Sequence, residues 1–107
     1  MRSIMQPHRR EDGICYLCLK LNHDFNPKTV YEHHVIFGGT SGRKTLSEKY
    51  GLKVFLCLYH HTAGKEAVHL NHKNARILQA DAQEAFERTY PELDFLKIFG
   101  MNYKGVE

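Results

Sequence analysis

Two short stretches of the sequence decide the fold: "YEHHVIFGG" at residues 31–39 and "FLCLYHH" at residues 55–61. Each contains an adjacent histidine pair beside residues that are typical of β-strands. A buried imidazole needs partners for its donor and its acceptor, or it needs a metal ion. The two stretches therefore predict two strands that deliver imidazoles to one place.

The three cysteines extend this pattern. Cys15-x-x-Cys18 is one half of a zinc site, and Cys57-x-x-His60 is the other half. A two-residue spacer lets both ligands of a half reach one ion, and Cys₃His is a known tetrahedral zinc set. An odd number of cysteines argues against a disulfide framework. We expect a structural Zn²⁺ ion; the alternative is three free buried cysteines that act as small apolar residues.

Length and composition fit one globular domain. The chain has 107 residues, of which 42% are hydrophobic and 25% charged, so wholesale disorder is not expected. The net charge of +3 is compatible with a nucleic-acid partner. No apolar run approaches the about 18 residues that span a membrane, and residues 1–12 contain no apolar signal region. We therefore expect a cytoplasmic protein with no membrane partner.

The first half of the chain is predicted to be mainly extended. Residues 1–12 are polar and basic and are predicted to form a flexible segment, followed by a single domain over residues 13–107. Residues 13–18 suggest a short β-like piece, and residues 29–37 and 52–57 suggest strands. Between the two strands, residues 45–51 suggest one helical turn that ends at Gly51.

The second half is predicted to be helical, over about residues 71–100. Leu78, Ala82, Ala85 and Phe86 form one apolar stripe at helical spacing. Pro91 is predicted in the first turn of a last helix, "PELDFLKIF", which ends at Gly100. Strands followed by helices predict a small α+β fold.

His33, His34 and His61 remain after the zinc ligands are assigned. Successive residues of a strand face opposite ways, so His33 and His34 are expected to take different roles. One of them would bind a second metal ion while the other faces a substrate. The alternative is that all these rings make satisfied hydrogen bonds in a small core.

At these residues the chain resembles a known family. "CYLC", "YEHHVIFGG" and "LCLYHHTAGK" together resemble the HNH endonucleases of the zinc-knuckle ββα-metal type, above all the small HNH proteins of phages and prophages. The resemblance covers roughly residues 13–72, and the tail "DAQEAFERTYPELDFLKIFGMNY" is similar to the C-terminal helices of such proteins. It implies a ββα-metal core stapled by the Cys₃His zinc site, with the C-terminal helices packed on it. The implied activity is hydrolysis of DNA phosphodiester bonds, by nicking or by double-strand cleavage.

The resemblance also implies roles for the histidines. His34 would be the general base, and His33 and His61 would bind a catalytic Mg²⁺ or Mn²⁺ ion on the scissile phosphate. His69 would be a third ligand or a brace, or otherwise an exposed residue at a helix start. The sequence departs from the family at its middle Asn, because no asparagine lies between Asn26 and Asn71. Candidates for that role are Ser47, Thr45 and a backbone carbonyl.

Several basic residues near the motif are candidate phosphate contacts. They would give affinity without reading the base sequence, and the alternative is a solvated charged surface. The resemblance implies a role in phage or prophage DNA processing in the bacterial host cytoplasm, with a packaging or recombination protein as a possible partner. The alternative functions are a catalytically weak or inactive HNH-fold module that binds DNA, and a zinc-stapled interaction module. The candidate DNA contacts are Arg43, Lys44, Lys53, Lys65 and Lys73.

Overall fold

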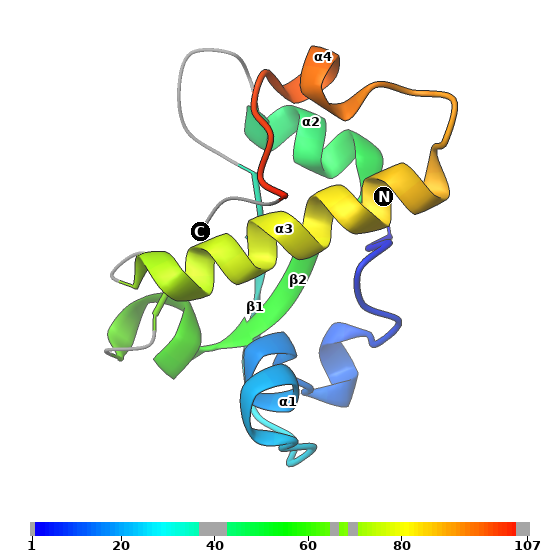
Figure 1. The fold of residues 1–107 in the computed structure, drawn as a ribbon. Helices are drawn as coiled ribbons and strands as arrows, with labels where there is room; N and C mark the ends of the chain where they lie inside the picture. The colour runs from blue at the N-terminus through cyan, green and yellow to red at the C-terminus, as the bar shows by residue number, and fades with distance from the viewer. Residues whose placement is uncertain (1, 37–42, 65–66, 69–70, 105–107) are drawn as a thin grey trace.

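The structure, a computed structural model, describes residues 2–36, 43–64, 67–68 and 71–104 (Figure 1). These residues form a two-stranded sheet and helices, so the α+β class is confirmed. Within them, no helix combines the length and apolar character needed to cross a membrane. In chain order the elements are η1 (Arg10–Asp12), α1 (Tyr16–Asn22), β1 (Val30–His34), α2 (Arg43–Tyr50), β2 (Lys53–Cys57), the π-helical turn η2 (Tyr59–Ala63), α3 (His72–Thr89) and α4 (Phe95–Phe99).

The strands β1 and β2 are antiparallel, and their register sets the direction of each histidine. His33 lies opposite Val54, and His34 lies opposite Lys53. Directly opposed residues share a face of the sheet, and successive residues alternate between faces. His33 and His34 therefore face opposite ways, as predicted. Both strands are shorter than the predicted ranges 29–37 and 52–57, and part of the first range lies outside the described residues.

Helix α3 runs across the hairpin (Figure 1) and carries the predicted apolar stripe. Leu78, Ala82, Ala85 and Phe86 are each at most 2% exposed, which confirms the helical pattern. Three of them, Leu78, Ala82 and Phe86, belong to the same buried cluster as residues of β2. The helix begins after Asn71, whose side chain accepts a hydrogen bond from the Asn74 backbone N–H and so caps the first turn.

An aromatic cluster joins α2, α3 and α4. The ring of Phe86 lies 5.2 Å from those of Tyr50 and Tyr90, 5.3 Å from Phe95 and 5.9 Å from Phe99, measured between centroids. Most of these pairs meet edge to face, which is a favourable arrangement for aromatic rings. The cluster fixes the C-terminal helices against the rest of the core.

Two local predictions were wrong, and capping explains both. Residues 13–18 are not β-like throughout, because the Cys15 sulfur accepts a hydrogen bond from the Cys18 backbone N–H and starts α1. The last helix begins at Phe95 and not at Pro91, because the Asp94 carboxylate accepts from the Lys97 backbone N–H and caps α4. Gly100 ends that helix in the left-handed conformation, as predicted.

Residues 3–6 lie along the outer edge of β2, and η1 contacts β1. Gln6 is buried, and its side-chain oxygen accepts from the Phe55 backbone N–H at 2.9 Å. Its amide nitrogen donates to the Ile14 carbonyl at 2.9 Å, and the Ile4 N–H donates to the Gly51 carbonyl at 2.9 Å. The Phe55 N–H points away from β1, and the side chain of Gln6 supplies its hydrogen-bond acceptor. The division into a flexible segment over residues 1–12 and a domain over 13–107 stays a prediction.

We expect the substitution Phe86→Ala to lower the free energy of unfolding by about 3–5 kcal/mol, because it leaves a cavity among four rings. Chemical denaturation of the protein measures this loss. Leu96→Ala is the matched control, since Leu96 lies on the neighbouring α4 and is 55% exposed. An equal loss in both variants would contradict the role of the aromatic cluster.

Candidate metal centre and histidine cluster

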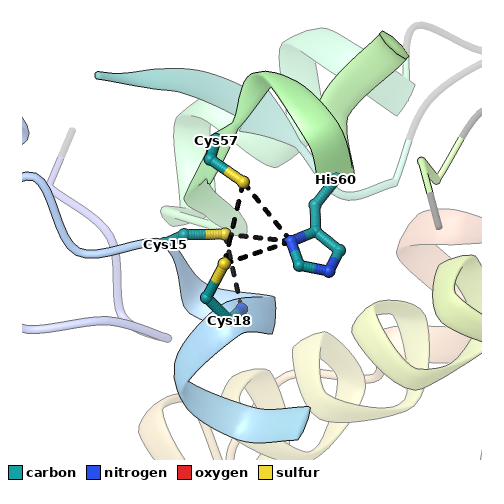
Figure 2. Close-up of side chains that lie close together, drawn as sticks. All are labelled: Cys15, Cys18, Cys57 and His60. Atoms are coloured by element: carbon teal, nitrogen blue, oxygen red, sulfur yellow. Dashed lines mark hydrogen bonds between the residues drawn. The ribbon is translucent and has the colours of Figure 1, made fainter. Parts of the chain in front are cut away.

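Cys15, Cys18, Cys57 and His60 converge at the junction of α1 and β2 (Figure 2). Cys15 caps α1 and Cys18 lies in its first turn, whereas Cys57 ends β2 and His60 lies in η2. All four side chains are buried, and the most exposed of them are Cys18 and Cys57 at 6%. The predicted pairing of two sequence-distant half-sites is therefore confirmed as a spatial cluster.

The distances within this cluster match the edges of a tetrahedral zinc site. The His60 Nδ1 atom lies 3.5 Å from the Cys15 sulfur and 3.4 Å from each of the Cys18 and Cys57 sulfurs. The Cys18 and Cys57 sulfurs are 3.7 Å apart. Zn–S bonds of about 2.3 Å and Zn–N bonds of about 2.0–2.1 Å give tetrahedral edges of about 3.8 Å between sulfurs and about 3.6 Å between sulfur and nitrogen. The four residues could therefore hold an ion such as Zn²⁺.

Burial affects the protonation of two thiols in this cluster, those of Cys15 and Cys18. Burial raises the pKa of the Cys15 thiol. Burial is also the main reason that the pKa of Cys18 is raised to about 12, and the charge of neighbouring Cys15 is the next largest cause. Without an ion these thiols hold their protons at neutral pH, and a bound ion must displace them because the thiolate is the ligand. Metal affinity therefore falls as the pH falls.

His33 and His61 meet on one face of the hairpin. Their ring centroids are 5.5 Å apart with an interplanar angle of 73°. Tyr31, two residues before His33 on the same face of β1, stacks on His61 with centroids 6.0 Å apart and an interplanar angle of 11°. His33 is buried and His61 is half-buried. The structure thus brings together the two histidines that the resemblance assigns to the catalytic ion.

His34 lies on the other face, in a cluster of charged groups. Its Nε2 atom lies 2.9 Å from a carboxylate oxygen of Glu48 and 3.8 Å from one of Glu32. The Lys53 ammonium donates to both oxygens of Glu48 at 3.0 Å and lies 3.2 Å from Glu32. We call Glu32, His34, Glu48 and Lys53 the His34 cluster.

The Lys53 ammonium is the cation that pairs with the two carboxylates of the His34 cluster. Glu32, His34 and Glu48 present metal-ligating atoms within 4.8 Å of one another. Burial by itself would lower the pKa of Lys53, but its hydrogen bonds to Glu48 and Glu32 outweigh that effect and raise the pKa. The ammonium therefore stays charged and neutralises the carboxylates. Lys53, a predicted DNA contact, is buried and directed to these carboxylates.

Ser47 braces the chain just after β1. Its hydroxyl donates to the Ile36 carbonyl at 2.6 Å and accepts from the Ile36 backbone N–H at 3.2 Å. The side chain is fully buried. Ser47 was one of the candidates for the role of the missing Asn, and the structure places it against the segment that follows His34.

Sequence reasoning missed Glu48 and Glu32. Glu48 directly follows Ser47 on α2, so adjacent residues of this helix contact His34 and brace Ile36. Glu32 lies two residues before His34 and shares its strand face. Strand alternation could have identified Glu32, whereas the approach of α2 to β1 is a tertiary contact without a signal in the local sequence.

Of the remaining predicted site residues, only Lys73 has a side chain that the structure describes. Arg43 and Lys44 begin α2, and their side chains lie outside the described part of the structure. Lys65 and His69 also lie outside the described residues. Lys73 is exposed in the first turn of α3, where it lines a hollow with Tyr59 and His60.

We expect the purified protein to contain zinc, and we expect chelation to unfold it. Structural zinc contributes an apparent binding free energy of about 10–16 kcal/mol, much of it coupled to folding. Elemental analysis and circular dichroism of Cys57→Ser and His60→Ala should show loss of zinc and of folded structure. His72→Ala, which changes an exposed histidine, should retain both. Folded wild-type protein without zinc would contradict the metal centre.

We expect Ser47→Ala to destabilise the protein by about 1–3 kcal/mol, because it leaves two buried backbone groups of Ile36 without their partner. Chemical denaturation measures the change. The control is Thr45→Ala, an exposed position on the same helix, which should change stability by less than about 0.5 kcal/mol. Equal free energies of unfolding for the two variants would show that the Ser47 hydrogen bonds do not stabilise the protein.

Comparisons of the chain with protein-family models, with curated proteins and with solved structures find no match. The Cys₃His cluster and the small α+β fold are what the chain's own geometry establishes.

Proposed function

We propose that the chain is a metal-dependent endonuclease of the HNH type that hydrolyses DNA phosphodiester bonds. The observation that supports this most is the contact between the rings of His33 and His61. His61 is adjacent in sequence to a residue of the Cys₃His cluster. His60 is a ligand of that cluster and His61 is the next residue. An ion bound by Cys₃His would therefore fix the turn that carries His61 and hold its ring against β1.

The His33–His61 pair has the chemistry of a second metal site. Two imidazoles with centroids 5.5 Å apart can each turn a ring nitrogen to one ion. Imidazole ligands suit transition ions, which favours Mn²⁺ over Mg²⁺ at this pair. When bound there, a divalent ion would supply Lewis-acid stabilisation of the phosphate and of the departing oxygen. His69 is the proposed third ligand.

His34 is the proposed general base. Glu48 accepts a hydrogen bond from His34 Nε2, so in the neutral form of the ring the lone pair is on Nδ1. A neutral imidazole with an available lone pair can take a proton from water at neutral pH. In this proposal Glu48 orients the base and Ser47 braces the adjacent segment, so the two share the role that HNH enzymes give to their middle Asn.

One observation favours a second candidate, a zinc-stabilised DNA-binding module without catalysis. His34 lies on the face of β1 opposite to His33, within the His34 cluster. There its Nε2 atom lies 2.9 Å from a Glu48 carboxylate oxygen and 3.8 Å from one of Glu32, so the ring is part of a polar network on that face. Both candidates assign DNA as the partner, and both place the protein in phage or prophage DNA metabolism in the bacterial cytoplasm.

We expect the zinc-loaded protein to nick supercoiled plasmid with added Mn²⁺ and to a smaller extent with Mg²⁺. His34→Ala should reduce the cleavage rate by about 10²–10⁴-fold, the usual contribution of a general base. Glu48→Gln should give a smaller loss and a changed pH profile of the rate, because it acts through His34. Gel electrophoresis of the plasmid over time measures all of these rates.

The control is His72→Ala, which should cleave at the wild-type rate, with zinc content measured for every variant. Cleavage by His34→Ala at the wild-type rate would remove His34 as the base. Plasmid binding without cleavage under any divalent ion would select the non-catalytic module.

A further inference from the structure

A cavity of about 340 Å³ lies between the N-terminal segment and the outer side of β2. It is separate from the Cys₃His cluster and is lined neither by His33 nor by His61. Its size falls within the range of about 300–1,000 Å³ that is typical of small-molecule sites. Glu32 and Lys53 line it from the sheet, so it adjoins the His34 cluster.

The rim of this cavity is cationic. Arg2, Arg9 and Arg10 line it, whereas the ammonium of Lys53, which also lines it, is paired with Glu32 and Glu48. Within the part of the chain that the structure describes, no carboxylate forms an ion pair with any of the three guanidiniums. Of the two carboxylates that line the cavity, Glu32 is already paired with Lys53. The three arginines are therefore available to an anion, and arginine binds phosphate oxygens with strong, directional hydrogen bonds.

The floor of the cavity is apolar. Phe55 and Pro7 supply this surface, whereas the side chain of Val54, which also lines the cavity, is buried on the other face of the sheet. The Phe55 ring faces the cationic rim, because the Arg10 guanidinium carbon lies 5.8 Å from the ring centroid. An aromatic side chain in a cavity lined by three arginines offers a flat, apolar surface to a base and charged donors to a phosphate.

The wall of the cavity is fixed in place by Gln6. This buried side chain bonds to the Phe55 N–H and to the Ile14 carbonyl, and its amide nitrogen lies 3.4 Å from His8 Nδ1. If His8 Nδ1 accepts that bond, its Nε2 bears the hydrogen and can donate to a ligand. The chain around Gln6 is thereby attached to β2 before a ligand enters, which lowers the entropy cost of binding.

We propose that this cavity, the N-terminal pocket, binds a nucleotide unit, with its phosphate held by Arg2, Arg9 and Arg10 and its base on Phe55. The unit is either a free mononucleotide or one nucleotide of a DNA strand, since both present the same phosphate and base. The pocket goes beyond the proposed nuclease activity, because it uses neither His33 nor His61. A DNA strand seated in it would also lie beside the His34 cluster, which shares Glu32 and Lys53 with the pocket.

The test is a nuclear magnetic resonance titration of the zinc-loaded, ¹⁵N-labelled full chain without Mg²⁺ or Mn²⁺. The probes are dAMP, a short 5′-phosphorylated oligothymidylate, inorganic phosphate and an oligoglutamate peptide. We expect dAMP to shift the amide signals of Phe55 and of residues 2–12. The double substitution Arg9→Gln/Arg10→Gln should weaken dAMP binding about tenfold or more, because it removes charge-assisted hydrogen bonds. Phe55→Leu should weaken binding of dAMP and leave binding of inorganic phosphate unchanged.

The matched control is Arg88→Gln, which changes an exposed arginine on α3 that pairs only loosely with Glu84 at 3.6 Å. It should leave dAMP binding unchanged. Tighter binding of the oligonucleotide than of dAMP assigns the pocket to a DNA strand, and equal binding assigns it to free nucleotides; both support the proposal. Equal affinity for phosphate and dAMP, tighter binding of oligoglutamate, or no effect of the double substitution would overturn it. Plasmid cleavage by a protein that does not bind dAMP would overturn the pocket and leave the nuclease standing.

Discussion

The structure depends on the convergence of three sulfurs and one imidazole nitrogen at the end of β2. Cys15 and Cys18 come from the start of α1, and Cys57 and His60 come from the hairpin and the turn after it. The buried core is small, and burial opposes ionisation of the Cys15 and Cys18 thiols. One ion that binds all four ligands would therefore link two distant parts of the chain more strongly than any single apolar contact.

Much of this arrangement could be predicted from sequence, because its signals are local. The two-residue spacers identified the four ligands of the metal centre. Helical spacing identified the buried stripe of α3, and strand alternation placed His33 and His34 on opposite faces. Each of these inferences uses only the period of a regular element or the reach of a short loop.

The parts that sequence did not reveal depend on tertiary contacts. The carboxylate that bonds to His34 comes from Glu48 on α2, and nothing near His34 in the sequence indicates that helix α2 packs beside β1. Residues 2–12 are mostly polar, yet the buried side chain of Gln6 and the backbone of Ile4 attach the segment to β2 and to Gly51 just before it. Side-chain bonds to a strand edge follow no periodic pattern, so sequence alone does not disclose them.

The adjacency of His60 and His61 couples the metal centre to the histidine pair. Because neighbouring residues carry the two roles, the ring of His61 reaches His33 only when the turn η2 is in place. If the four residues hold an ion, its loss would release that turn and separate the pair. Each molecule would then be either assembled with its ion or open without it, so a falling supply of metal would change the fraction of assembled molecules and not the geometry of each one.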